Sequence, residues 1–164
     1  MANASSQLSQ HHLRLGALVG AWVGDEQVAA SAWTAAGAAE SDVAAEPLFG
    51  GVFVEQRYRQ VRDQSVAFES RNVFGFDATD QRYKLYQFDT FGFAPPTPAS
   101  GVWEGDDLVF ERSSPRGTQR TVFHFENEDS YRMSVSFLPA GGSDWQEVVS
   151  GSYRRSTSVS KSNS

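Results

Sequence analysis

Charged side chains occur inside several apolar, strand-like segments, and these residues are the ones best placed to do chemistry. Glu69 and Arg71 lie in FESRNV, and Asp89 lies in YQFDT. A buried charge is costly unless it is paired or functional. If all three side chains point inward, they form a polar patch in a cavity and orient a largely apolar ligand. The alternative is that they lie on the solvent face of each strand, where charge serves solubility.

Large apolar side chains offer the contact area that such a cavity needs. Most residues of these types fill the core of a β protein, but a small closed barrel can keep one ligand-sized void. The candidates for the lining of that void, all in strand-like segments, are Tyr58, Trp103, Tyr131 and Met133. The ligand-binding residues predicted from the sequence are therefore Tyr58, Glu69, Arg71, Asp89, Trp103, Tyr131 and Met133.

The histidines and cysteines of the chain do not indicate a metal or catalytic centre. The sequence has 3 His and no Cys, and His11, His12 and His124 lack the spacing of a zinc site. His124 alternates with two phenylalanines, and we interpret it as a structural or surface residue. No G-x-S-x-G elbow, G-x-G-x-x-G turn or Walker-type loop is present. We expect no metal and no cofactor, and the pattern leaves open whether the protein is an enzyme.

The charge of the chain restricts its partners. A formal net charge of −6 and a sequence pI near 5.0 argue against a nucleic-acid partner, because few cations are present to replace phosphate counterions. The first twenty residues have neither a basic start nor a long apolar run, so no secretory signal or membrane span is predicted. We expect a cytoplasmic protein without a membrane partner, and a homodimer is one further hypothesis.

A period-two alternation begins near Trp22 and continues to the end of the WQEVVSGSYRR segment. The clearest example is SYRMSVSF, where apolar residues alternate with Arg132, Ser134 and Ser136. Turn signals separate the runs at short intervals, including AAGAAE at 35–40 and the Pro-rich FAPPTPAS at 93–100. About nine or ten antiparallel strands follow from this spacing. That many strands close on themselves or fold into a sandwich to hide their edges.

The two ends of the alternating region favour the closed arrangement. Trp22 opens the first strand, and Arg154 and Arg155 close the last one. In a closed barrel these strands are neighbours, so the indole and a guanidinium can stack at the plugged end, contributing about 1 kcal/mol. The alternative is that Trp22 is a core residue and the arginines are solvated.

A short amphipathic helix precedes the strands. Leu8, His12, Leu15, Leu18 and Val19 recur at spacings of three and four, and the pattern predicts a helix that ends between Gly16 and Gly20. Such a helix can cover one end of a barrel. The small polar residues before it and the Ser-rich residues after Arg155 predict flexible ends. The predicted organisation is a flexible N-terminus at 1–8, one barrel domain at 9–155 and a flexible tail at 156–164.

Several segments occur in the order and spacing of a bacterial family known as domain of unknown function 1579. They are LGALVGAWVG at 15–24, VAASAW at 28–33, EPLFGGVFV at 46–54, GFD at 75–77, YKLYQFDTFG at 83–92, GVWEGDDL at 101–108 and WQEVVSGSYRR at 145–155. The resemblance implies a lipocalin-like (calycin-type) barrel and no activity. Together with the strand and helix patterns, it predicts a single all-β, antiparallel barrel with a short N-terminal helix. The chain more distantly resembles nitrobindin-like barrels, in which a histidine on a late strand holds haem. The late strand here offers Tyr153 instead, so haem binding is not carried over.

The leading functional interpretation is a barrel that binds a small, mostly apolar molecule in its cavity. One alternative is a cofactor-independent enzyme of small-molecule metabolism, a cyclase or isomerase in which an inward carboxylate moves a proton. A second alternative is a structural or assembly protein with a filled barrel.

Overall fold

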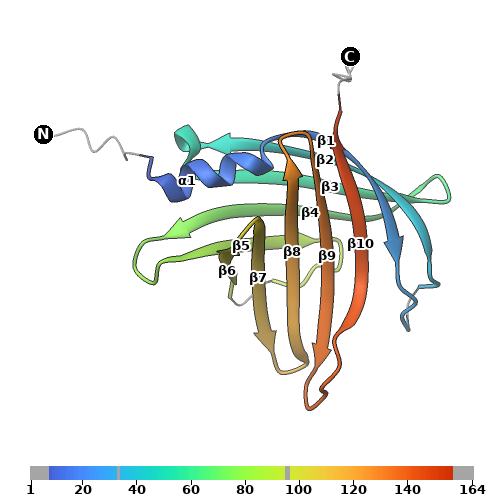
Figure 1. Ribbon diagram of the computed structural model, residues 1–164. Helices are drawn as coiled ribbons and strands as arrows, with labels where there is room; N and C mark the ends of the chain where they lie inside the picture. The colour runs from blue at the N-terminus through green and yellow to red at the C-terminus, as the bar shows by residue number, and fades with distance from the viewer. Residues whose placement is uncertain (1–7, 33, 95–96, 157–164) are drawn as a thin grey trace, which may run out of the picture.

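The computed structural model describes residues 8–32, 34–94 and 97–156, and in them ten antiparallel strands form one closed barrel (Figure 1). The chain begins with helix α1 (Gln10–Leu15) and a 3-10 turn, Gly16–Leu18. The strands are β1 (Gly20–Val28), β2 (Gly37–Leu48), β3 (Phe53–Arg62), β4 (Ser65–Asp77), β5 (Arg82–Asp89), β6 (Ala99–Glu104), β7 (Asp107–Ser114), β8 (Gly117–Asn127), β9 (Ser130–Pro139) and β10 (Gln146–Arg155). A second 3-10 turn, Phe49–Gly51, joins β2 to β3. The ends predicted to be flexible fall mostly at 1–7 and 157–164, outside the described residues.

The first and last strands close the barrel, as the sequence predicted. Strand β1 pairs with β10 in a register that sets Trp22 opposite Arg155. The Arg155 guanidinium carbon lies 4.3 Å from the centre of the Trp22 ring, and its Nη1 donates to the Val19 carbonyl at 2.9 Å. Trp22 itself is buried and donates through Nε1 to the Leu18 carbonyl at 3.1 Å. The predicted cation–π contact is therefore confirmed.

Replacing Arg155 by methionine is expected to lower the free energy of unfolding by about 2 kcal/mol, because a cation–π contact and hydrogen bonds to main-chain carbonyls are lost together. Arg154→Met is the matched control, since that side chain is 64% exposed and, among the described residues, bonds only to Asp25, at 3.2 Å. The control is expected to change stability by no more than about 0.5 kcal/mol. Urea unfolding of both variants makes the comparison, and equal losses would contradict a closing role for Arg155.

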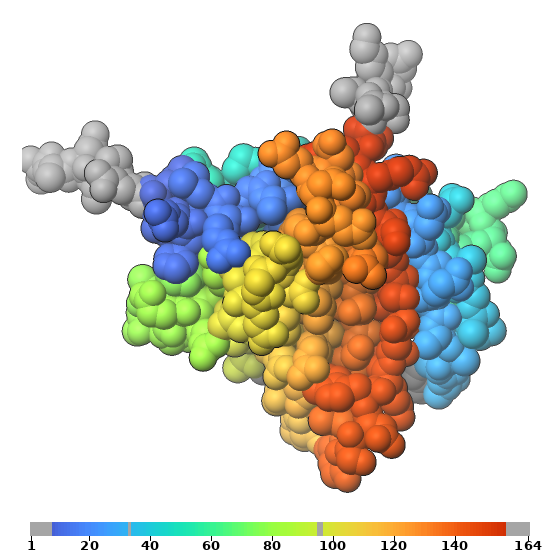
Figure 2. All heavy atoms as spheres, in the orientation of Figure 1, coloured from blue at the N-terminus to red at the C-terminus, as the bar shows by residue number. Residues whose placement is uncertain are grey.

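Helix α1 and the 3-10 turn cover one end of the barrel. Ser9 caps the helix by accepting from the His12 amide, and Leu15 and Leu18 are fully buried against the barrel. The Tyr83 hydroxyl donates to the His11 carbonyl at 3.0 Å and ties the helix to β5. Helix α1 ends at Leu15, and the 3-10 turn Gly16–Leu18 carries the helical segment into the predicted range of Gly16 to Gly20. Figure 2 shows the helix seated on the barrel, while β8, β9 and β10 continue to the opposite end.

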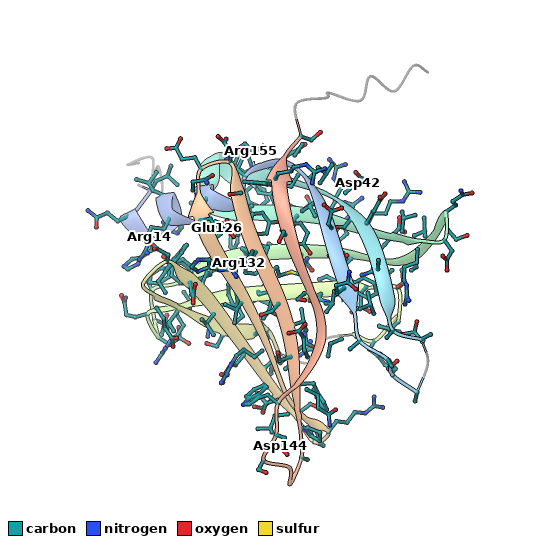
Figure 3. All side chains as sticks on the ribbon, turned by 45° about the vertical axis from the view of Figure 1, so that its right-hand side comes forward. Arg14, Asp42, Glu126, Arg132, Asp144 and Arg155 are labelled. Atoms are coloured by element: carbon teal, nitrogen blue, oxygen red, sulfur yellow. The ribbon has the colours of Figure 1, made fainter. Side chains whose placement is uncertain are left out.

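The half of the barrel next to α1 is filled by aromatic side chains. Phe74, Phe110 and Phe123 are fully or almost fully buried, with ring centroids 5.7 to 6.4 Å apart. Their edge-to-face contacts suit rings packed in a barrel interior. Arg14 of α1 stacks on Trp103 at 4.1 Å and extends this packing to the barrel rim. Figure 3 shows Arg14 and Arg155 at this end and Asp144 at the other.

One predicted turn is part of a strand. AAGAAE at 35–40 was expected to be a turn, but β2 begins at Gly37 and pairs Ala39 with Glu26. Ala39 is buried on the inner face, so ladder pairing and burial outweigh the weak strand preference of alanine and glycine. The prediction of a turn over the whole of 35–40 was therefore wrong.

Candidate functional site

A buried carboxylate lies in the middle of the barrel interior. Glu26 of β1 is only 2% exposed. The Tyr58 hydroxyl lies 2.7 Å from both of its oxygens, Gln60 Nε2 donates to Oε1 at 3.0 Å, and the Tyr153 hydroxyl donates to Oε2. No ion pair involving Glu26 occurs among the described residues. Neutral donors rather than a cation therefore stabilise this carboxyl group.

The tyrosines around Glu26 are held in their protonated form. Burial, followed by the nearby Glu26 carboxylate, raises the pKa values of Tyr58, Tyr131 and Tyr153 well above that of an ordinary tyrosine. An anionic phenolate would be poorly solvated there and would face another negative charge. At neutral pH these hydroxyls are neutral, and those of Tyr58 and Tyr153 donate hydrogen bonds to Glu26.

Two glycines make room for the ring of Tyr153. A Cβ atom on Gly24 would lie 2.4 Å from Tyr153 Cε1, and one on Gly151 would lie 2.7 Å from the Tyr153 hydroxyl. Both distances are far inside van der Waals contact, so any side chain at either position would displace the ring. Tyr131 stacks on the ring at a centroid distance of 4.8 Å and an interplanar angle of 12°. The two glycines and Tyr131 therefore position the Tyr153 ring so that its hydroxyl donates to Glu26.

A second polar group lies on neighbouring inner positions of β3 and β4. Asn72 Nδ2 donates to Gln56 Oε1 at 2.9 Å and to Ser70 Oγ at 3.2 Å, and all three residues are buried. Asn72 Oδ1 and Ser41 Oγ are buried and have no hydrogen-bond partner among the described residues. The middle of the lumen is therefore polar, whereas the half next to α1 is aromatic.

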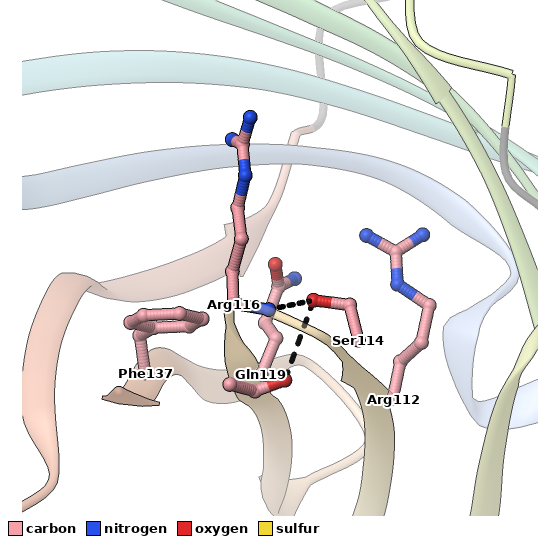
Figure 4. A pocket seen from close by; sticks show the side chains of 6 residues that line it. Arg112, Ser114, Arg116, Gln119 and Phe137 are labelled. Atoms are coloured by element: carbon pink, nitrogen blue, oxygen red, sulfur yellow. Dashed lines mark hydrogen bonds between the residues drawn. The ribbon is translucent and has the colours of Figure 1, made fainter. Parts of the chain in front are cut away.

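A cavity opens at the end of the barrel remote from α1. Its volume is about 340 Å³, and its lining residues come from the β7–β8 hairpin and from β9 (Figure 4). They are Arg112, Ser114, Arg116, Gly117, Gln119 and Phe137, which we call the mouth cavity. A much smaller void of about 10 Å³ lies beside it and shares Arg112 and Gln119. Its other walls include Phe110 and Leu85, so the mouth cavity borders the filled core.

Strand alternation explains why these side chains face the interior. Leu108 and Phe110 of β7 are buried, and Arg112 and Ser114 follow them at intervals of two. Gln119 stands in the same relation to Thr121 of β8. Gly117 has a φ of +147°, and a Cβ atom there would lie 2.1 Å from the Leu138 carbonyl oxygen, so only glycine fits at the base of the hairpin.

The structure places the seven predicted ligand-binding residues on both faces of the barrel. Tyr58 and Tyr131 are buried inside, and Trp103 and Met133 are partly buried against the core. Asp89 is half-buried and accepts hydrogen bonds from Gln87 Nε2 at 3.3 Å and the Phe91 amide at 3.0 Å. None of these five belongs to the lining of the mouth cavity.

The other two predicted residues lie outside. Glu69 is exposed and faces Arg59 at 3.7 Å, and Arg71 is exposed and pairs with Glu55 at 2.8 Å. Ser70 between them is buried, so the alternation of β4 turns both charges to solvent. An inward orientation of Glu69 and Arg71 is therefore wrong, and these side chains do not form a lumen patch with Asp89.

The sequence prediction included Tyr58 but missed Glu26, its hydrogen-bond partner, and Arg112 of the mouth cavity, although the alternation carried a signal for both. Glu26 shares the inward parity of Trp22, and Arg112 shares that of Leu108 and Phe110. His124 lies on the outer parity of β8, is partly exposed and contacts Asp107. Within the described ranges, no group of three or more His, Cys, Asp or Glu side chains could hold a metal ion.

Known proteins share the fold of this chain. A protein from M. tuberculosis, Rv2717c, superposes with a TM-score of 0.66 at 14% identity, covering 92% of this chain and 99% of the other. An S-type phycobiliprotein lyase, CPES, from Guillardia theta superposes with a TM-score of 0.63 at 13% identity, covering 93% and 95%. These likenesses show the barrel fold alone. No curated protein sequence matches the chain.

Two further findings concern the whole described chain. No helix in its described part has both the length and the apolar character needed to cross a membrane. The model of the family described as protein of unknown function (DUF1579) matches residues 7–155, which include α1 and all ten strands. The predicted resemblance and the predicted closed barrel are thus confirmed, and the chain belongs to the DUF1579 family.

Proposed function

We propose that the protein binds a small, mostly apolar molecule in the open half of its lumen. The observation that carries this proposal is the mouth cavity of about 340 Å³ on the inner face of β7, β8 and β9. Ligand pockets commonly measure about 300–1,000 Å³, and barrel mouths are among their usual places. The packed aromatic half of the barrel provides a rigid floor for such a site.

Apolar side chains at and near the mouth cavity favour a ligand with an apolar body. Phe137 contributes a ring to the lining, and Phe93, in the segment after β5, lies 6.0 Å from the Arg116 guanidinium. Phe93 is 71% exposed, so it keeps apolar surface that a bound molecule would cover. Gln119 and Ser114 add polar groups that fix orientation.

The geometry favours binding over the enzymatic alternative. A proton transfer by Glu26 requires its carboxyl group to reach a substrate. Both of its oxygens already accept hydrogen bonds from Tyr58, Tyr153 or Gln60, and Glu26 lines neither of the two cavities described above. The fold shared with the phycobiliprotein lyase assigns no chemistry to this chain.

Filling the mouth cavity tests the proposal. The neutral fluorescent probe N-phenyl-1-naphthylamine is expected to bind the wild-type protein, and Ser114→Trp is expected to weaken binding at least tenfold because the indole occupies the cavity that Ser114 lines. Ser113→Trp is the matched control: Ser113 is the adjacent residue on the outer face, with its hydroxyl 2.9 Å from that of Thr118. The control is expected to bind within twofold of wild type.

Fluorescence titration measures all three proteins, and thermal unfolding verifies that each variant is folded. Equal probe affinity in the Ser114→Trp and Ser113→Trp proteins, or no saturable binding to the wild type, would overturn the proposal.

A further inference from the structure

We infer that the molecule bound in the mouth cavity is an organic anion whose acidic group contacts Arg112 and Arg116. This inference rests on the proposed function and specifies the class of ligand. It starts from an unusual placement of charge: the cavity of an acidic protein, with a net charge of −6, is lined by two arginines and by no acidic residue.

Most arginines of the outer face have acidic partners, although Arg62 and Arg82 form no ion pair among the described residues. Six of the outer face form ion pairs with carboxylates: Arg57, Arg59, Arg71, Arg120, Arg132 and Arg154. Within the described part of the chain, neither Arg112 nor Arg116 forms an ion pair or a side-chain hydrogen bond. A guanidinium stays charged at all accessible pH values, so burial cannot neutralise Arg112. Its half-buried charge therefore lacks the compensation given to arginines that are more exposed.

The Arg112 and Arg116 side chains extend to the same side of the hairpin (Figure 4). Arg112 stands on β7 and Arg116 in the following turn, and Figure 4 shows both side chains extending away from the hairpin on the same side, with Ser114 between them. The turn is fixed by hydrogen bonds: Ser114 Oγ accepts from the Arg116 amide at 3.3 Å and donates to the Gly117 carbonyl at 3.4 Å. A fixed turn limits the entropy lost when the arginines close on an anion.

One acidic residue of inner parity, Asp89, has hydrogen-bond partners other than Arg112. Asp89 stands on the inner face of β5, and Gln87 next to it lines the small void that Arg112 also borders. Yet the Asp89 carboxylate accepts from Gln87 Nε2 and from the Phe91 amide, and no ion pair joins it to Arg112. The Arg112 guanidinium is therefore available to bind an external anion. The Phe137 ring can contact the apolar part of the same molecule.

Guanidinium groups bind carboxylates and phosphates with paired hydrogen bonds. The test therefore uses three probes with one apolar body: 2-naphthoate, 2-naphthyl phosphate and the neutral 2-naphthalenemethanol. Isothermal titration calorimetry on the full chain is expected to show at least tenfold tighter binding of one or both anions than of the alcohol. The tighter anion identifies the acidic group as carboxylate or phosphate.

Two variants of Arg112 and one control locate the effect. Arg112→Gln is expected to weaken anion binding by roughly tenfold to a hundredfold, the range for a charged hydrogen bond, while binding of the alcohol stays within twofold. Arg112→Lys keeps the positive charge, so its affinity for the anions is expected to fall less than that of Arg112→Gln. Arg82→Gln removes the same charge from an exposed residue on the outer parity of β5 and is expected to leave all affinities within twofold.

The outcomes separate the inference from the proposed function. Equal affinity for anions and alcohol, or equal effects of Arg112→Gln and Arg82→Gln, would overturn the anionic ligand and leave apolar binding intact. Binding of N-phenyl-1-naphthylamine without binding of either anion would likewise overturn the anionic ligand and leave the proposed apolar binding intact. If N-phenyl-1-naphthylamine does not bind the wild-type protein, the proposed function fails and the inference fails with it.

Discussion

Replacing Glu26 by alanine is expected to lower the free energy of unfolding by about 4 kcal/mol. The change removes the acceptor for the Tyr58 hydroxyl, the Tyr153 hydroxyl and Gln60 Nε2, all of them buried. A buried donor left without a partner costs about 1–3 kcal/mol, and part of that loss is recovered because Gln60 also reaches the Tyr58 hydroxyl at 3.2 Å. Chemical denaturation with tryptophan fluorescence as the signal measures the loss.

Two further variants make this result interpretable. Glu26→Gln keeps one acceptor oxygen in the same place and is expected to lose less stability than Glu26→Ala. Glu40→Ala removes an exposed glutamate from β2 and is expected to change stability by no more than about 0.5 kcal/mol. Should Glu26→Ala behave like Glu40→Ala, the carboxyl group would not organise the middle of the lumen.

Alkaline pH is expected to destabilise the protein steeply, beginning near pH 10. Burial and Glu26 raise the pKa values of Tyr58, Tyr131 and Tyr153 in the folded protein, whereas in the unfolded chain these tyrosines ionise near 10.0. Above that pH the unfolded state loses protons that the folded state retains, so stability falls as pH rises. Each tyrosine contributes about 1.4 kcal/mol per pH unit, and the three together about 4 kcal/mol by pH 11.

Denaturation curves at pH 8, 9, 10, 10.5 and 11 measure this slope. Tyr153→Phe removes one of the three groups and is expected to reduce the slope by about a third, although it also lowers stability at neutral pH. Tyr86→Phe is the control, because Tyr86 is 40% exposed on the outer parity of β5. A slope that is unchanged by Tyr153→Phe and equal to that of the control would contradict the buried-tyrosine account.

The fold was predictable because its determinants are local and repeated. Alternation in SYRMSVSF fixed which residues of β9 face inward, and Tyr131 is indeed buried. The pairing of Trp22 with Arg155 followed from one global condition, that the first and last strands meet. The turn assigned to 35–40 failed because Ala39 is held in β2 by burial and by pairing with Glu26, which local composition does not reveal.

The site was harder to predict, because a charged residue within a strand can face either the lumen or the solvent. Glu69 and Arg71 attracted attention among apolar neighbours, yet each is neutralised by a cross-strand partner on the outer face. Glu26 and Arg112 are inward charges that the sequence prediction did not name, and only their parity with buried neighbours distinguishes them. The hydrogen bonds from Tyr58 and Tyr153 to Glu26 come from β3 and β10, distant positions that sequence spacing does not bring together.

A crystal structure of the protein with 6-bromo-2-naphthoate tests the central claim most directly, because anomalous scattering locates the bromine without reference to any fitted pose. We predict a bromine peak within the mouth beside Phe137, with the carboxylate in hydrogen-bonding contact with the Arg112 guanidinium. A peak only on the outer face of the barrel, for instance against the exposed rings of Tyr86 and Phe88, would contradict a ligand site in the lumen.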